Sequence, residues 1–266
     1  MLDRFNREIH YIRISVTDRC NQRCVYCMPK DGVPKIRHED ILSFEEIFQV
    51  TQKAVEMGID KIRLTGGEPL VRRDIVTLVS MLSKIEGIKD FAMTTNGIIL
   101  DRFAEGLVKA GLHRVNISLD TLNPEKYREI TRDGDIKSVL RGIEAAKKAG
   151  FSPIKINCVV QKSSDEEDAC QVAAFTEKNG IEVRFIRKMN IDMGLFWPVE
   201  GGTGGDCDRC NRLRISSDGK VFPCLFSDLA FSIREIGVEK AIRQAVKVKP
   251  KSGLRSKYNR FNTIGG

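Results

Sequence analysis

The stretch Tyr11–Cys27, YIRISVTDRCNQRCVYC, joins an apolar segment to a loop with three cysteines. The apolar run Tyr11–Val16 predicts a strand. Short apolar runs of this kind recur along the chain and alternate with helical patterns. The sequence predicts five further strands, at Ile59–Leu64, Phe91–Thr95, Arg114–Leu119, Ile154–Val160 and Glu182–Ile186.

Helical signals occupy the segments between these strands. Ser43-Phe44-Glu45-Glu46 is a capping box, which predicts the start of a helix. Ile75, Leu78, Val79 and Leu82 repeat with helical spacing, and further helices are expected at Arg102–Ala110, from Asn123-Pro124 to about Lys148, and at Asp165–Lys178. Strands that alternate with helices form right-handed units around a parallel sheet. We therefore predict an α/β fold, an incomplete (β/α)6 TIM-type barrel, with a doubly wound open sheet as the alternative.

The pattern changes near residue 200. A glycine-rich stretch, Gly201–Gly205, leads to a second group of cysteines, a helix expected near Ile233–Val248, and a basic tail that ends in Gly265-Gly266. We predict two parts: residues 1–200 as the partial barrel, and residues 201–266 as a small C-terminal extension. In barrels of this kind, the chemistry lies at the C-terminal ends of the strands.

Composition narrows the class of protein. The chain of 266 residues has 44 Lys and Arg against 36 Asp and Glu, a formal net charge of +8. This excess fits either a solvated basic surface or an anionic partner such as a nucleotide or nucleic acid. No apolar run approaches the length of a membrane span, and the first residues do not resemble a signal peptide. The cytoplasm is the expected compartment.

The first cysteine group has the spacing CxxxCxxC, at Cys20, Cys24 and Cys27. Four irons need four outer ligands, and this loop offers three thiolates. One iron of a [4Fe–4S] cluster would therefore keep an open position for a small chelating ligand. A zinc site is the alternative, but zinc prefers four ligands, and none of His10, His38 and His113 lies in the loop.

The second cysteine group, Cys207, Cys210 and Cys224, again supplies three thiolates. It predicts either a second iron–sulfur cluster or a zinc site completed by Asp206, Asp208 or water. Arg212 and Arg214 follow with alternating spacing, so both would point the same way from an extended segment. Planar guanidinium groups suit a triphosphate, although a solvated surface pair is the simpler interpretation.

Several motifs together resemble the radical S-adenosylmethionine (SAM) superfamily. Gly66-Gly67-Glu68-Pro69, after the second strand, is similar to its GGEP motif. The likeness narrows to the GTP 3′,8-cyclase family of molybdenum cofactor biosynthesis, in a shortened form. The segments that carry it are Arg13–Asn21, Cys27–Pro29, Arg63–Leu70, Thr94–Gly97, Arg184–Ile186, Cys207–Arg214, Ser217–Lys220, Cys224–Phe226 and the terminal Ile264–Gly266.

The resemblance implies a role for each of these sites. The six cysteines would hold two [4Fe–4S] clusters, and no side chain would act as a nucleophile. The residues implied to contact SAM are Tyr26, Gly66, Gly67, Glu68, Ser118, Asp120 and Met189. Those implied to contact GTP are Arg13, Arg63, Thr94, Lys155, Arg212 and Arg214. The implied activity is that of a lyase: a 5′-deoxyadenosyl radical takes hydrogen from C3′ of GTP, and the carbon radical adds to guanine C8.

The same resemblance implies an external electron donor and a downstream enzyme that forms the pterin. Two departures affect the substrate. The family has several dozen residues where this chain has only the short passage from Met189 to Cys207, and Arg187 stands where an acidic residue is usual. A two-cluster paralogue or maturase that acts on another molecule or peptide is therefore the alternative. A zinc-dependent nucleic-acid-binding protein is disfavoured, because the basic tail contains only one aromatic residue, Tyr258, before Arg260.

Overall fold

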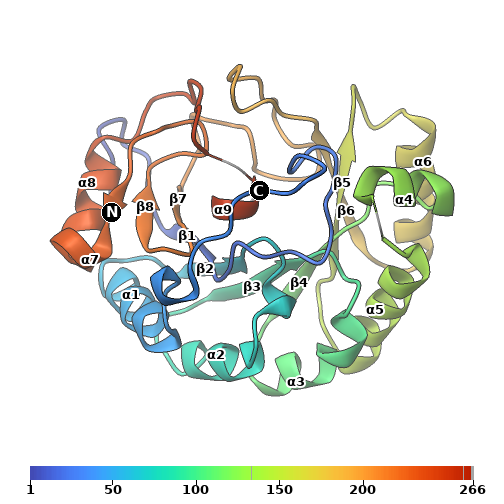
Figure 1. Ribbon diagram of the computed structural model, residues 1–266, viewed down its shortest axis with the longest axis horizontal. Coiled ribbons are helices and arrows are strands. Elements are labelled where there is room, and N and C mark those ends of the chain that lie inside the picture. Colours follow the sequence, from blue (N-terminus) through green and yellow to red (C-terminus); the bar gives the residue numbers. More distant parts are fainter. Residues whose placement is uncertain (133, 260, 265–266) are drawn as a thin grey trace.

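The computed structural model describes residues 1–132, 134–259 and 261–264 (Figure 1). Within these residues, one sheet runs in the order β6-β5-β4-β3-β2-β1-β7-β8-β9. The first six strands are parallel to their neighbours. Their bounds are β1 Tyr11–Ser15, β2 Lys61–Thr65, β3 Asp90–Thr95, β4 Arg114–Ser118, β5 Lys155–Val160 and β6 Glu182–Arg187. The predicted α/β class and the six strands are confirmed.

The helices of the barrel lie along the convex side of the curved sheet (Figure 1). They are α1 Phe44–Glu56, α2 Ile75–Leu82, α3 Ala104–Lys109, α5 Ile136–Ala149 and α6 Glu167–Lys178, with short 3-10 turns at η1 His38–Asp40, η2 Pro69–Val71 and η3 Leu100–Arg102. The capping box forms as expected, since Ser43 accepts from the Glu46 amide and Glu46 accepts from the Ser43 amide. Helices on one side and an open edge fit an incomplete barrel rather than a doubly wound sheet.

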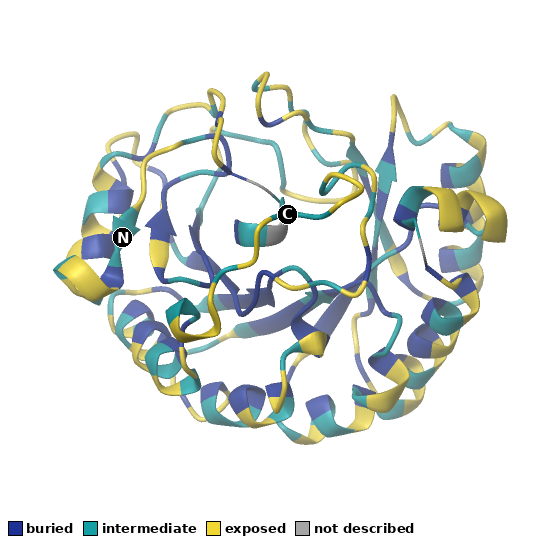
Figure 2. Cartoon of the chain, viewed as in Figure 1, coloured by how far each residue is buried: buried dark blue, intermediate teal, exposed yellow. Residues whose placement is uncertain are grey.

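The buried side chains of these helices meet the outward face of the strands. Figure 2 shows the strands and the inner helix faces as buried. The core is aliphatic: Ile12, Ile14, Ile62, Leu64 and Val115 are fully buried. Burial of such side chains stabilises the fold by about 1.5–3 kcal/mol each. This leaves the concave face and the strand ends free for polar groups.

One predicted helix is divided in the structure. The expected helix from Asn123-Pro124 to about Lys148 is two helices, α4 (Pro124–Thr131) and α5, so that prediction was wrong. The chain leaves α4 at Arg132, which has a positive φ of 65°. Asp135 then caps α5 by accepting a hydrogen bond from the Lys137 amide. The periodic apolar pattern concealed this break because it continues in both helices.

The C-terminal part continues the same sheet. β7 (Arg212–Ile215) pairs in parallel with β1, and β8 (Lys220–Phe222) and β9 (Phe231–Ser232) follow antiparallel. The predicted helix at Ile233–Val248 is also divided, into α7 (Ile233–Ile236) and α8 (Val238–Lys247), at Gly237. A last helix, α9 (Phe261–Ile264), lies near the centre of the open barrel in Figure 1. The two-part division at residue 200 remains a prediction.

No helix in the described part of the chain is long and apolar enough to cross a membrane.

Candidate active site

A cavity of about 360 Å³ lies inside the open barrel. Its lining extends from Tyr11 and Lys61, the first residues of β1 and β2, to the loops that follow the C-terminal ends of the strands. Its size is within the range of small-molecule sites. Eighteen of the nineteen predicted site residues line it. They are the six cysteines, Arg13, Tyr26, Arg63, Gly66, Gly67, Glu68, Thr94, Ser118, Asp120, Met189, Arg212 and Arg214.

Lys155 is the predicted residue that does not line the cavity. It begins β5, and its ammonium group pairs with Glu182 at the start of β6. The N-terminal ends of strands lie away from the functional end of a barrel. Its contact with substrate therefore remains a prediction, and the structure gives it an ion-pair partner instead.

The first cysteine loop is fixed by α4. The amides of Arg23 and Val25 donate to the carbonyls of Thr131 and Ile130 at the end of that helix. The Cys27 amide donates to the Cys24 carbonyl, which closes the turn between these two thiols. Burial raises the pKa of the Cys20 thiol to about 12 in the absence of a metal ion. Binding of a metal at this thiol must therefore displace its proton.

The Gly66–Pro69 turn is joined to this loop by main-chain contacts. The Gly67 amide donates to the Thr17 carbonyl at 2.7 Å, and the Glu68 amide donates to the Arg19 carbonyl at 2.8 Å. A Cβ at Gly67 would lie 2.3 Å from the Arg19 oxygen, so only glycine fits this close approach. The turn therefore positions the cysteine loop.

Glu68 stabilises the same loop through a series of hydrogen bonds. Its buried carboxylate accepts from the Thr95 hydroxyl at 2.7 Å, the Leu70 amide at 3.0 Å and the Asn96 amide at 2.6 Å. Burial nevertheless raises the pKa of Glu68 to about 7. The Asn96 side chain then donates to Asn21 at 2.7 Å, beside Cys20. In this structure Glu68 is a positioning residue, because its oxygens are directed to the protein.

Asp120 links the cysteine loop to the ends of β4 and β5. One carboxylate oxygen accepts from the Tyr26 hydroxyl at 2.7 Å, and the other accepts from the Val159 amide at 2.8 Å. Burial raises the pKa of Asp120 to about 6. Ser118 and Met189 line the cavity at the ends of β4 and β6. Tyr26 and Asp120 therefore lie at the first cysteine loop, whereas Met189 packs in the apolar group that includes Cys224.

The second cysteine group lines the cavity beside β7 and β8. The Cys210 amide donates to the Cys207 carbonyl, and the Phe226 amide donates to the Cys224 sulfur at 3.4 Å. Lys249 is 1% exposed, and its ammonium donates to the carbonyls of Arg212 and Pro223. Burial alone would raise the pKa of Cys210, but the charges of Lys249 and Arg212 lower it. This favours the thiolate form that binds metals.

Between the two cysteine groups, the cavity wall is strongly basic. Nine cations line the cavity: Arg13, Lys61, Arg63, Arg184, Arg187, Lys188, Arg212, Arg214 and Lys249. The acids among the lining residues are Glu68, Asp120 and Asp206. The buried Nε atoms of Arg63, Arg184, Arg187 and Arg212 have no hydrogen-bond partner in the described part of the chain. Buried charges without sufficient counter-charge are costly, so this wall is suited to a polyanionic ligand.

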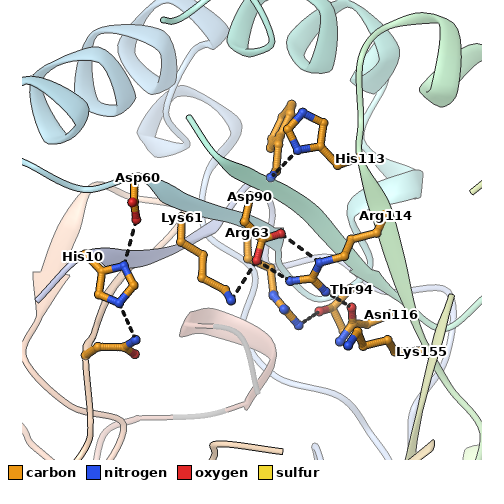
Figure 3. A network of polar contacts seen from close by, with 12 residues as sticks. His10, Asp60, Lys61, Arg63, Asp90, Thr94, His113, Arg114, Asn116 and Lys155 are labelled. Atoms are coloured by element: carbon orange, nitrogen blue, oxygen red, sulfur yellow. Dashed lines mark hydrogen bonds and ion pairs between the residues drawn. The ribbon is translucent and has the colours of Figure 1, made fainter. Parts of the chain in front are cut away.

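The pKa of Tyr11 indicates that its surroundings are strongly positive. Burial alone would raise its pKa, but Arg63, Arg13 and Arg212 outweigh that and lower it to about 8. The guanidinium of Arg63 lies 5.6 Å from the Tyr11 ring centre, and one of its nitrogens donates to Thr94 at 3.4 Å. Asp90 pairs with Arg114 and with Lys61 at the N-terminal ends of the strands (Figure 3), so Lys61 is a cavity cation that has an acid partner. Acids therefore compensate cations at the N-terminal ends of the strands, whereas cations outnumber acids along the cavity wall.

The short passage between β6 and the second cysteines closes one side of the cavity. The Arg187 guanidinium lies 3.9 Å from the ring centre of Trp197. The chain turns at the glycine-rich stretch, where the Val199 amide donates to the Gly204 carbonyl. A Cβ at Gly205, where φ is +74°, would lie 1.9 Å from the Trp197 oxygen. Residues 188–206 therefore form a compact strap, which we call the β6–β7 strap, across this opening.

The C-terminal segment also reaches the cavity. Phe261 lines it, and Arg214 donates to the Ile264 carbonyl at 3.2 Å. Gly265 and Gly266 lie outside the described residues.

Comparison with known proteins gives the family. The model of the Radical SAM superfamily matches residues 14–176. A GTP 3′,8-cyclase of Thermodesulfovibrio yellowstonii is 38% identical over all of both chains. One of Peptoclostridium acidaminophilum is 43% identical over 86% of this chain and 84% of its own length. The chain belongs to the radical SAM superfamily and, within it, to the GTP 3′,8-cyclase family.

Solved structures support the fold of this radical SAM chain. It superimposes on Streptococcus suis SuiB with a TM-score of 0.66, at 16% identity, over 97% of this chain and 71% of that one. It also resembles native anSMEcpe with bound AdoMet and a peptide, with a TM-score of 0.62 at 16% identity over 91% of this chain and 80% of that one. The alignment with the Thermodesulfovibrio relative extends over 322 residues, whereas this chain has 266. Several dozen residues of that relative therefore have no counterpart here.

Membership of the superfamily implies one [4Fe–4S] cluster and SAM, and the first site fits them. Its three thiols are sulfur ligands, converge on one cavity and leave a fourth position open. In the described part of the chain, no three His, Cys, Asp or Glu side chains are close enough to share a single metal ion.

The sequence missed several residues of this radical SAM site. Arg184 and Arg187 were noticed only as part of a motif and as a departure from it, and Lys249 only as one basic residue of the tail. Lys61 and Asn96 also line the cavity. Their positions in the sequence could have indicated them, because most of them lie in or directly after a strand whose neighbouring strands contain predicted site residues.

Proposed function

We propose that this chain cyclises GTP to (8S)-3′,8-cyclo-7,8-dihydroguanosine 5′-triphosphate in molybdenum cofactor biosynthesis. The observation that carries the proposal is the cavity itself: two groups of three cysteines line it together with a wall rich in cations and poor in acids. Relatives named GTP 3′,8-cyclase that align with the whole chain support the same substrate. The downstream enzyme that forms the pterin is proposed from the resemblance alone.

For the radical step, Cys20, Cys24 and Cys27 would hold the cluster. When bound, the cluster and SAM supply an adenosyl radical that removes hydrogen from C3′ of the ribose. The chain's own part is to position the reactants and exclude water. Tyr26, Ser118, Asp120 and Met189 would contact SAM, while the Gly66–Glu68 turn holds the cysteine loop against them.

We assign the guanine and the triphosphate of the substrate to different walls of the cavity. Cys207, Cys210 and Cys224 would hold a second [4Fe–4S] cluster whose open iron meets the guanine. Arg13, Arg63, Arg212 and Thr94 would bind the triphosphate, because guanidinium groups make charge-assisted, bidentate bonds to phosphate oxygens. In this scheme residues 1–200 generate the radical and supply Arg13, Arg63 and Thr94 for the triphosphate, whereas residues 201–266 hold the guanine and supply Arg212.

Anaerobic incubation of the reconstituted protein with SAM, dithionite and GTP, followed by mass spectrometry, tests the proposal. We expect 5′-deoxyadenosine together with an isomer of GTP. Cys20→Ala should abolish both products, whereas Cys224→Ala should abolish the GTP isomer and retain some 5′-deoxyadenosine. Cys170→Ala is the control, because Cys170 is exposed on α6 and lies outside the cavity.

The alternative is a two-cluster enzyme with another substrate. The shortened passage before Cys207 and the basic Arg187 are the observations that favour it. Formation of 5′-deoxyadenosine with unchanged GTP, in protein with about six to eight irons as two clusters require, would support that alternative and refute the cyclase assignment.

A further inference from the structure

A buried glutamine lies between the first two cysteines of the loop. Gln22 is 4% exposed and lines the cavity. Its main-chain amide donates to the Cys20 sulfur at 3.4 Å, and its side-chain oxygen accepts from the Cys24 thiol at 3.8 Å. The nitrogen of the same side chain donates to the Tyr127 hydroxyl at 2.8 Å. One residue therefore contacts two thiols of the first site.

Tyr127 and Gly134 hold the side-chain amide of Gln22 in place. Tyr127 is 3% exposed and belongs to α4, which also binds the cysteine loop through main-chain hydrogen bonds. A Cβ at Gly134 would lie 2.7 Å from Nε2 of Gln22 and 2.6 Å from the Tyr127 ring. This packing fixes the plane of the amide. An exchange of its oxygen and nitrogen ends preserves its shape, so the packing permits both orientations.

The proton on Cys24 decides which orientation of the amide is favourable. As a thiol, Cys24 donates to the Gln22 oxygen. As a ligand of iron it is a thiolate, because metal binding releases the proton to solvent. A thiolate only accepts hydrogen bonds, so the oxygen would then face an electron-rich sulfur with no proton between them. A half turn of the amide removes this repulsion: Nε2 donates to the Cys24 sulfur, and Oε1 accepts from the Tyr127 hydroxyl, whose hydrogen can rotate.

Asn96 makes a comparable contact with the other end of the loop. Its Nδ2 lies 3.9 Å from the Cys20 sulfur and donates to Asn21 at 2.7 Å. This amide already presents a donor to sulfur, so it needs no change when Cys20 becomes a thiolate. Gln22 differs because its partner is the hydroxyl of Tyr127, which can both accept and donate. The Gln22–Tyr127 pair can therefore satisfy both protonation states of a cysteine.

We propose that Gln22, oriented by Tyr127, donates a hydrogen bond to the Cys24 thiolate and thereby raises the reduction potential of the first cluster. Hydrogen bonds to the sulfurs are among the features that set the potential of iron–sulfur clusters, because they stabilise the added electron. In this role Gln22 is a positioning residue, since it acts through Cys24. The inference goes beyond the proposed function: it requires the cluster that membership of the superfamily implies, and it does not depend on GTP.

The test compares the reduction potential of the first cluster in the parent protein and in Gln22→Met, which keeps the size of the side chain and removes its N–H groups. Reconstituted protein is titrated anaerobically with dithionite, and the reduced cluster is followed by EPR. Addition of SAM identifies the signal of the first cluster, because SAM binds at its open iron. Thr51→Val is the matched control: Thr51 is fully buried in α1, on the convex side of the sheet, and its hydroxyl donates to the Ile47 carbonyl. That variant also removes a buried hydrogen bond.

We expect Gln22→Met to lower the equilibrium constant for reduction by about tenfold, which corresponds to about 59 mV for a one-electron couple. Tyr127→Phe keeps the amide but removes the hydroxyl that orients it, and it should lower the same constant by about threefold, or about 28 mV. Thr51→Val should leave the potential unchanged. An unchanged potential in Gln22→Met with full iron content, or a shift of the same size in Thr51→Val, would overturn the proposal.

Labelling of glutamine side chains with ¹⁵N gives a second readout, which a merely structural role of Gln22 would not produce. Among the described residues that line the cavity, Gln22 is the only glutamine. If Nε2 donates to Cys24, pulsed EPR of the reduced cluster should show a ¹⁵N coupling in the parent protein that is lost in Gln22→Met. Absence of this coupling in the parent overturns the proposal, because the oxygen then still faces the sulfur. If Gln22→Met retains too little iron for the titration, the potential of Tyr127→Phe and the coupling in the parent decide the question.

Discussion

The electropositive wall of the cavity should make the stability of this protein depend on the ionisation of Tyr11. The side chain is 6% exposed and lies among Arg63, Arg13 and Arg212, which lower its pKa from 10 to about 8. In the unfolded chain the phenol titrates near 10. A folded-state pKa below the unfolded value stabilises the protein above the unfolded pKa, and this stabilisation is lost as the pH falls through the folded value.

The size of this effect follows from the shift. About two pH units at about 1.4 kcal/mol each give roughly 2.7 kcal/mol. We therefore expect the free-energy difference between the parent and Tyr11→Phe to be constant below about pH 8 and to grow by about 2–3 kcal/mol between about pH 8 and pH 10. Tripolyphosphate should reduce the growth, because a bound polyanion neutralises the same arginines.

Urea unfolding of the metal-free protein at about pH 7, 8.5 and 10 measures this dependence. Tyr258→Phe is the control, since Tyr258 is 79% exposed and should show the same difference from the parent at every pH. A difference for Tyr11→Phe that is unchanged across this range would refute the electrostatic description of the wall. So would equal behaviour of the two variants.

Three further predictions concern the supports of the site. Glu68→Gln should lower the free energy of unfolding by about 2–3 kcal/mol and reduce iron retention, because the NH2 group that replaces one carboxylate oxygen cannot accept the hydrogen bonds made now. Glu129→Gln, on the exposed side of α4, is the control and should change the urea midpoint little. Gly205→Ala should weaken GTP binding in calorimetry by at least about tenfold, because its Cβ would collide with the Trp197 oxygen and move the β6–β7 strap. Its control is Gly180→Ala, at a similar positive φ with open space around it, which should cost only about 1 kcal/mol of stability and leave binding unchanged. Lys249→Met should destabilise the fold by about 1–3 kcal/mol in urea and lower the iron content towards half, since it leaves two buried carbonyls without a donor beside the second cysteines.

The sequence predicted the strands well because their signal is local. Each of the six barrel strands is a short apolar run, and the polar residues after it fall at one end of the sheet. Parallel topology then brings those ends together without further information. This is why Cys20, Gly67, Asp120 and Met189, far apart in the chain, could be placed at one end of the sheet from position alone, whereas Ser118 and the contacts with SAM came from the family resemblance.

The sequence could not predict local backbone breaks or contacts between residues that are distant in the chain. The break between α4 and α5 rests on the positive φ of Arg132 and the new cap at Asp135, in a stretch that is polar enough for a helix surface. The supporting role of Glu68 rests on Thr95 and Asn96, which belong to the next strand and its end. Lys155 could not be separated from Arg63 by pattern, since both lie in strands; only the register shows that Lys155 begins its strand beside Glu182.

The shortened passage and the basic wall are best considered together. The β6–β7 strap places Trp197 on Arg187, and its glycines contact Arg184 and Arg212 closely, with a Cβ at Gly202 only 3.3 Å from the Arg184 side chain. A longer passage with bulkier residues could not approach these guanidinium groups so closely. The strap therefore covers one side of the cations while leaving them in excess over the acids of the cavity. This chain can lack several dozen residues of its relatives and still present a wall suited to a triphosphate, because seven of the nine cavity cations come from the strands. The strap adds only Lys188 while it closes the space around them.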